Sequence, residues 1–300
     1  MTKYKVGDVV ARKSYGADVI FKIVEIKNQG NQPLYVMKGV NYRIIADANE
    51  IDLISQNERN LKKEGMRFEP IITKITKRCN AMQCNMNNKV AGTARYRKSG
   101  DSATIPFFRS GKVLHLDGDE EYLEACMQKY KELKVIVIGK YVPEIDQPLK
   151  VRALLEEYEP DILVLTGHDG VSKNKNEYLN INNYRNSKYF VAAVKEARKY
   201  RSCLDELVIF AGACQSYYKE LLCAGSNFAS SPLRELIHTL DPVFVCEKIA
   251  HAHAEKMLSP IEVIKNTITG AKGIGGIGTR GKTRQGFPCD AYCDANKNKQ

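Results

Sequence analysis

The sequence lacks any hydrophobic run long enough to cross a bilayer. Apolar stretches such as residues 135–138 and 162–165 have the length of buried strands, whereas a membrane span needs roughly 20 residues. Residues 1–8 also lack the apolar core of a secretory signal peptide. We therefore expect no membrane insertion, no export by a signal peptide, and a cytoplasmic location.

Cysteine pairs with the Cys-x-x-Cys spacing of many metal sites are also missing. The nine cysteines are scattered and odd in number, and no two of them form a Cys-x-x-Cys pair. A disulfide framework would be typical of a short secreted chain, which this sequence does not resemble. His251 and His253 are two residues apart, so in the expected helix they would face different directions. We predict reduced cysteines, no metal and no cofactor.

Acidic residues are scarcer than basic ones. The chain has 35 Asp and Glu against 46 Lys and Arg, for a formal net charge of +11. Residues 57–113 concentrate this excess, with thirteen basic and four acidic residues. Such a segment indicates an acidic partner, either nucleic acid, an anionic surface or an acidic protein. The Asn-rich residues 79–89 and the turn at residues 99–101 favour a loop-like connection.

The rest of the chain divides into two parts by its hydrophobic pattern. Residues 1–56 contain short β-branched runs broken by Gly, Asn and Pro, which predicts a small SH3-like β-barrel. From residue 114 to 300, uncharged strands alternate with helices, ahead of a Gly-rich tail. That alternation predicts an α/β domain whose parallel sheet has helices on both faces.

The elements expected in the α/β domain follow from periodicity and capping residues. The strands are expected at residues 135–138, 162–165, 207–210 and 243–246. The helices are expected at residues 120–133, 149–158, 189–200, 217–223 and 231–240, then one through residue 257 and one at residues 260–269.

His168 and Cys214 each come shortly after an expected strand. Carboxyl ends of neighbouring parallel strands meet at one sheet edge, where functional residues gather, so this thiol and imidazole would face one substrate bond. An imidazolium and a helix N-terminus would activate Cys214 as a nucleophile, and His168 would protonate the leaving amine. The N–H of Cys214, with that of Asp169 or Gly170, would bind the oxyanion.

This pattern resembles the caspase–legumain–gingipain clan of cysteine peptidases, in which a strand ending in His-Gly precedes one ending in Ala-Cys by roughly 50 residues. Residues 213–215 match the core of the caspase motif, and the resemblance implies a caspase- or flavodoxin-like parallel sheet. Gly212 and Ser216 differ from that motif, and Asp169 separates His168 from the following glycine.

Four stretches together are similar to the YabG family of sporulation-specific cysteine proteases: residues 6–16, 167–170, 212–216 and 273–284. The resemblance implies an enzyme of the mother cell of spore-forming bacteria, associated with the spore coat, that cleaves coat and related proteins next to Arg. A carboxylate should then line the specificity pocket, because a guanidinium pairs best with a carboxylate. The candidate substrate-binding residues are Asp169, Asp205, Glu247 and Gln215. Self-processing in the Arg-rich residues 78–98 is a further expectation.

Two phosphate-loop motifs and a binding function remain as alternatives. Residues 276–283 match a Walker A motif and residues 273–278 a dinucleotide motif, but each needs a strand before it and a helix after it. We expect a Gly-rich surface loop there instead.

The main alternative is a non-enzymatic protein that binds nucleic acid or an acidic coat protein through the β-barrel and the basic segment. Its affinity would fall steeply with salt.

Overall fold

The computed structural model describes residues 3–29, 32–94, 107–171 and 178–286, with the backbone alone at residues 29, 84–94 and 107. Its centre is a six-stranded sheet in the order β13-β11-β10-β9-β7-β8. Strands β7 to β11 run parallel, and β13 is antiparallel to β11. The strands are β7 (Lys112–Asp117), β8 (Ile136–Tyr141), β9 (Ile162–Thr166), β10 (Val208–Ala211), β11 (Phe228–Ser230) and β13 (Ile274–Gly276).

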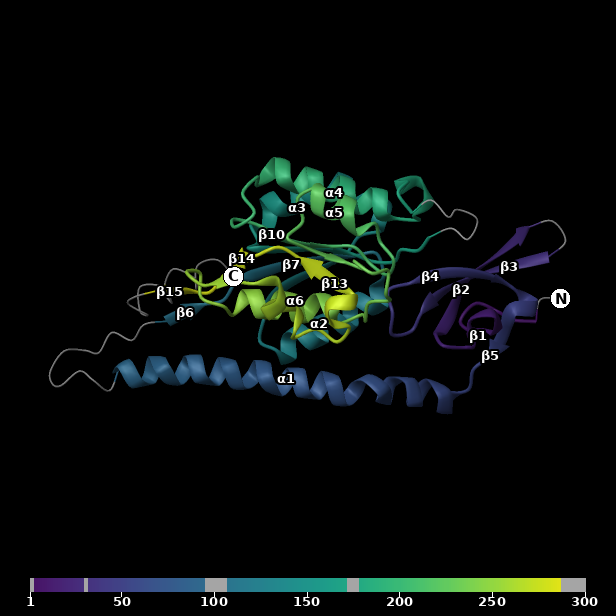
Figure 1. Cartoon of the computed structure of the whole chain (residues 1–300), viewed down its shortest axis with the longest axis horizontal. Helices are drawn as coiled ribbons and strands as arrows, with labels where there is room; N and C mark the ends of the chain where they lie inside the picture. Colours follow the sequence, from purple (N-terminus) through teal and green to yellow (C-terminus); the bar gives the residue numbers. More distant parts are fainter. Residues whose placement is uncertain (1–2, 30–31, 95–106, 172–177, 287–300) are drawn as a thin grey trace.

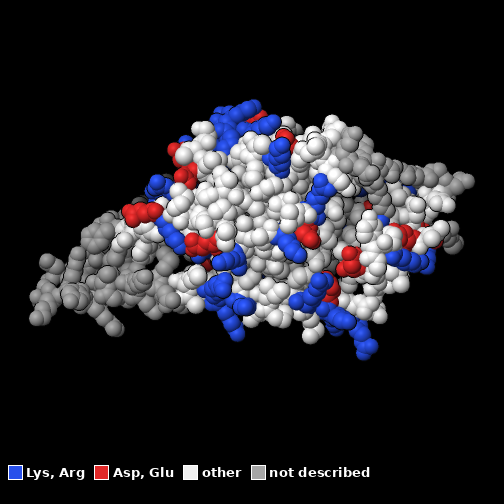
Figure 2. Space-filling model, in the orientation of Figure 1, with Lys and Arg blue, Asp and Glu red and all other residues white. Residues whose placement is uncertain are grey.

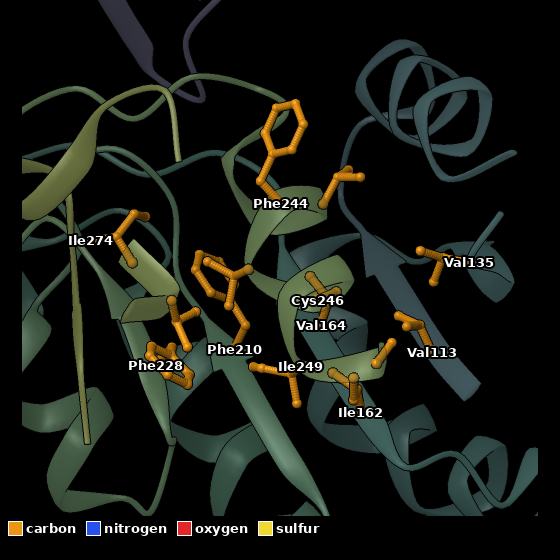
Figure 3. Close-up of a cluster of buried hydrophobic side chains, with 14 of the residues drawn as sticks. Val113, Val135, Ile162, Val164, Phe210, Phe228, Phe244, Cys246, Ile249 and Ile274 are labelled. Carbon is orange, nitrogen blue, oxygen red and sulfur yellow. The ribbon is translucent and has the colours of Figure 1, made fainter. Parts of the chain in front are cut away.

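Helices cover both faces of this sheet, as the alternating pattern predicts (Figure 1). On one face lie α3 (Gln147–Tyr158), α4 (Ser187–Tyr200) and α5 (Tyr218–Cys223). On the other lie α2 (Glu120–Glu132), α6 (Asp241–Ala250) and α7 (Pro260–Ile264). Leu163 and Leu165 of β9 face the first layer, and Ile162 and Val164 face the second. Figure 3 shows Val164 among the side chains of the second layer. Burial on both sides explains why the strands are continuously apolar.

The N-terminal part is a separate five-stranded antiparallel sheet in the order β4-β3-β2-β1-β5. Its strands are β1 (Val9–Arg12), β2 (Ile20–Gln29), β3 (Gln32–Gly39), β4 (Ile45–Asn49) and β5 (Leu53–Ser55). They enclose a small core of their own that includes Phe21, Tyr35 and Met37. The predicted all-β module is therefore present as a sheet, while its closure into an SH3-like barrel stays a prediction.

The basic segment contains a long helix, which corrects the expectation of a loop at residues 79–89. Helix α1 (Glu58–Ala94) runs along the outside of the second helical layer (Figure 1). Phe68, Ile75 and Cys79 are buried on one side of it, at helical spacing, and the last two belong to the main core. Its exposed basic residues are Arg59, Lys62, Lys63, Arg67, Lys74, Lys77 and Arg78. Figure 2 shows Lys and Arg side chains along the lower part of the molecule, where Figure 1 places α1. The turn expected at residues 99–101 lies outside the described residues.

Three further expectations about the second half are wrong. Residues 231–240 form turns instead of a helix, because Ser231 has a φ of 60°, outside the extended conformation of a helix N-cap. Residues 243–246 belong to α6, not to a strand, since a short apolar run buried on all sides suits either element. The Gly-rich tail is no surface loop, because β13 pairs with β11 and Ile274 lies in the core.

Short strands complete the fold: β12 (Met257–Leu258) pairs with β14 (Thr279–Arg280), and β15 (Arg284–Gly286) pairs with β6 (Phe107–Arg109). Helix α7 ends at Ile264, five residues short of the expected position. Within the described residues, no helix is both long and apolar enough to cross a membrane.

Candidate active site

Strands β9 and β10 bring His168 and Cys214 to one edge of the sheet. The two strands are parallel neighbours, the arrangement that the sequence argument requires, with Leu165 opposite Ala211. Strand β7 lies on the other side of β9, with Asp117 opposite Thr166. Three strand ends therefore meet at this edge, and the residues that follow β7 join those that follow β9 and β10.

Glu144 holds the imidazole ring of His168. One carboxylate oxygen, Oε1, accepts a hydrogen bond from the backbone N–H of His168 at 2.7 Å and lies 3.3 Å from Nδ1 of its ring. Glycines at positions 118 and 167 leave room for this carboxylate, because a Cβ at either would lie 2.3 Å from an atom of Glu144. This contact engages Nδ1 with Glu144, so the other ring nitrogen, Nε2, faces away from Glu144.

Asp119 lies on the other side of the same ring. Its Oδ2 is 3.2 Å from Nε2 of His168, in an ion pair that lacks hydrogen-bond alignment. The buried Lys38 of the N-terminal sheet donates to the same carboxylate at 2.6 Å. Burial alone would lower the pKa of His168, but Asp119 and Glu144 outweigh it and raise that pKa to about 9. The ring is therefore an imidazolium at neutral pH, able to donate a proton.

Cys214 is fully buried in this arrangement. Its Sγ accepts a hydrogen bond from the backbone N–H of Ile237 at 3.2 Å. Burial raises the pKa of Cys214 well above the usual value for a thiol. In this closed state Cys214 carries a neutral thiol, and the polar contacts of His168 go to Glu144 and Asp119.

A backbone carbonyl from the N-terminal part occupies the predicted oxyanion position. The carbonyl oxygen of Arg43 accepts hydrogen bonds from the N–H of Cys214 at 3.1 Å and from that of Asp169 at 3.4 Å. Residues 41–43 run antiparallel to residues 237–239, joined by backbone hydrogen bonds of 3.0 and 3.3 Å. A chain held in this way has the main-chain pairing of an extended peptide in a protease cleft.

The side chain of Arg43 fills a closed polar pocket. Its Nη1 donates to Asp117 at 2.8 Å, and its Nε and Nη2 donate to the carbonyl of Thr239 at 3.2 and 3.0 Å. Nη2 also donates to Sγ of Cys126, and His115 lies 3.3 Å from Asp117 on the far side. Burial would raise the pKa of Asp117, but Arg43 and His115 outweigh it and lower that pKa. The pocket therefore presents a carboxylate to a guanidinium.

Asp169 has a different position from the one expected of a specificity residue. Its buried carboxylate accepts four hydrogen bonds, from the N–H groups of Gly170 and Asn186 and the hydroxyls of Ser187 and Ser216. These bonds tie the loop after β9 to the loop after β10. The N–H of Gly170 is used in this network, so Asp169 supplies the second donor at the oxyanion position.

The other sequence-predicted substrate residues lie elsewhere. Asp205 precedes β10 and so lies at the opposite end of that strand from Cys214. Oε1 of Glu247 lies 3.4 Å from Nδ1 of His251 and accepts a hydrogen bond from Gln83 of α1. Gln215 follows Cys214 but has a φ of 58°, and its N–H donates to Ser231. None of these three contacts Arg43 within the described part of the chain.

The residues that sequence reasoning missed are Asp117, Asp119 and Glu144. Asp117 and Asp119 follow residues 113–116, where Val and Leu are interrupted by His115; without that histidine the run would match those before His168 and Cys214. His115, Asp117 and Cys126 also offer ligand atoms within 4.8 Å of one another, the only such cluster among the described residues. Burial raises the pKa of Cys126 to about 12, and the guanidinium of Arg43 contacts both Asp117 and Cys126, so the cluster is suited to an organic cation.

The Walker A lysine has a structural role. Nζ of Lys282 donates to the backbone carbonyls of Asp205 and Glu206 at 2.6 and 2.9 Å. The strand before this motif is β13, and β14 lies within it, which is not the strand–loop–helix arrangement that cradles a phosphate.

Comparison with known proteins identifies the family of this chain. The family model described as YabG peptidase U57 matches residues 5–288. The chain is 41% identical over 290 residues to a sporulation-specific protease of Bacillus subtilis (strain 168), covering 95% of this chain and 98% of that protein. No solved structure matches the chain with significance. The match extends over both the N-terminal sheet and the α/β domain, and the chain therefore belongs to the YabG family of peptidases.

Proposed function

We propose that this sporulation peptidase is a cysteine endopeptidase that cleaves after Arg. The observation that supports this most directly is the position of Arg43. Its carbonyl accepts from the N–H groups of Cys214 and Asp169, and its guanidinium donates to Asp117. A substrate Arg at the same place would have its carbonyl next to the nucleophile and its charge neutralised in the pocket.

The reaction follows from these contacts. Cys214 releases its proton to solvent, because His168 is already protonated. The thiolate then attacks the substrate carbonyl carbon, while the two N–H groups bind the developing oxyanion. His168, oriented by Glu144, gives a proton to the leaving amine, and the thioester remains on Cys214. A water molecule then attacks the thioester, with His168 as the base. This releases the substrate carboxylate and restores the thiol.

The resemblance to sporulation proteases supports a location and a substrate class. We propose that the enzyme acts in the mother cell on spore coat and related proteins. We also propose that the N-terminal sheet is SH3-like, on the basis of its five-strand order, and that the exposed basic residues of α1 attract acidic substrates.

Hydrolysis of an Arg-containing peptide by the Cys214→Ala variant tests this function. We expect a folded protein with no hydrolysis, whereas Cys223→Ala, which removes an exposed thiol, keeps the wild-type rate. Normal hydrolysis by Cys214→Ala would refute the proposal. Absence of hydrolysis in the wild type, together with salt-sensitive binding of nucleic acid or acidic protein, would favour the non-enzymatic alternative.

A further inference from the structure

The connection between β3 and β4 passes through the catalytic cleft of its own chain. Before Arg43, the segment pairs with residues 237–239 in an antiparallel bridge. After Arg43, Ile44 forms a parallel bridge with Asp169, and the N–H of Ile45 donates to the carbonyl of Asp169 at 3.4 Å. The cleft therefore holds the chain on both sides of one peptide bond, the bond between Arg43 and Ile44.

The burial of Arg43 indicates a specific occupant of the cleft. Arg43 is the largest fully buried side chain among the described residues, and its partner Asp117 is also 0% exposed. A buried guanidinium is unfavourable unless a charge and hydrogen bonds compensate it, and this pocket supplies both. Cys214 is buried beneath the same segment, so another peptide cannot bind there until the segment leaves.

We propose that the bond between Arg43 and Ile44 is the first substrate of this enzyme, and that residues 41–45 keep the cleft closed until the same chain cuts it. This inference rests on the proposed function. It adds a specific bond, an intramolecular route and a block on activity before the cut.

The cut uses the chemistry of the cleft. The thiol proton of Cys214 passes to solvent, Sγ bonds to the carbonyl carbon of Arg43, and the C–N bond to Ile44 breaks. The amine of Ile44 takes a proton from His168, which is the residue before the bridge partner of Ile44. Water then hydrolyses the thioester, leaving a carboxylate on Arg43 and a thiol on Cys214.

The fragments remain associated after this cut. Strand β3 pairs with β4 from Leu34 opposite Asn49 to Lys38 opposite Ile45, and β1 pairs with both β2 and β5. Only the new chain ends at Arg43 and Ile44 become free, so they can leave the cleft without unfolding the N-terminal sheet. We expect the cut protein to be the form that accepts other substrates.

Intact-mass spectrometry of the purified full chain tests this proposal. We expect the wild type to yield residues 1–43 and 44–300, with a rate constant that does not change over a 100-fold range of protein concentration. Cys214→Ala keeps the bond between Arg43 and Ile44 intact, even when mixed with the active wild type, because this bond lies inside its own cleft. Arg152→Gln, which changes an exposed Arg of α3, is cut as the wild type is.

Two variants of Arg43 complete the test. Arg43→Gln is not cut at this position but hydrolyses an Arg-containing peptide without a lag. Should this variant fail to fold, Arg43→Lys keeps the charge and is cut at least tenfold more slowly than the wild type. The proposal is overturned if the wild type hydrolyses the peptide through Cys214 while the bond after Arg43 stays intact, or if self-cleavage is confined to residues 78–98. Either result would leave the proposed function as a cysteine endopeptidase unaffected. If the wild type hydrolyses neither the peptide nor its own chain, the proposed function and this inference are both wrong.

Discussion

Asp117 should determine the preference for Arg, and the change Asp117→Asn measures its contribution. The carboxylate and the guanidinium of Arg43 are both wholly buried and 2.8 Å apart. Removing one partner of a buried, hydrogen-bonded charge pair costs about 2–5 kcal/mol. With tenfold for every 1.4 kcal/mol, kcat/KM for an Arg peptide should fall roughly 30- to several-thousand-fold.

The assay compares a fluorogenic Arg peptide with its citrulline analogue, which keeps the shape of Arg but carries no charge. The wild type should prefer Arg strongly, and Asp117→Asn should treat the two peptides almost alike. Asp205→Asn is the matched control, because its carboxylate contacts Arg280 at 3.6 Å, away from the cleft. The assignment is refuted if Asp117→Asn keeps kcat/KM for the Arg peptide within about threefold of the wild type. It is also refuted if Asp205→Asn lowers kcat/KM as much as Asp117→Asn is expected to.

Four further predictions follow from the site and from α1. Activity should decline as pH rises through about 9, where His168 loses its proton, and Glu144→Gln should move this limb of kcat/KM to lower pH. The raised pKa of His168 also stabilises the folded protein. This contribution to the free energy of unfolding is complete below about pH 6.5 and is lost as pH rises through about 9. Denaturation of the wild type and of His168→Gln at a series of pH values measures it. Phe68→Ala should lower the free energy of unfolding by about 3–5 kcal/mol, whereas Met66→Ala, on the exposed side of α1, should change it by less than about 0.5. A thiol alkylator should label Cys214 slowly in the uncut chain and at least tenfold faster once the chain is cut or carries Arg43→Gln, because only the occupied cleft buries it.

The sequence was sufficient to predict the two strand ends that carry His168 and Cys214. Continuous apolar runs identify β9 and β10, and the edge rule for parallel sheets then puts the following residues together. The same reasoning applies to residues 113–116 and would have added Asp117. That run was missed because it contains His115, a polar residue that the structure buries beside Asp117 and Tyr130.

The role of Arg43 could not be predicted from local pattern. Its contacts are with Asp117, Thr239 and Cys214, which are distant in sequence and meet it only after the two sheets pack together. The helix α1 is a different case, because Phe68, Ile72 and Ile75 recur at helical spacing. Pro70 and the high charge of the segment obscured that period, although Pro70 lies on the exposed side of α1.

The most direct test of the central claim is to map where an Arg-containing electrophile reacts. A peptidyl-arginine halomethyl ketone, incubated with the cut protein and analysed by peptide mass spectrometry, should add one equivalent to Cys214. The citrulline analogue, and the Asp117→Asn variant, should react at least tenfold more slowly. An adduct on another residue, or equal labelling by the two reagents, would contradict an active site in which Cys214 attacks the carbonyl of an Arg bound by Asp117.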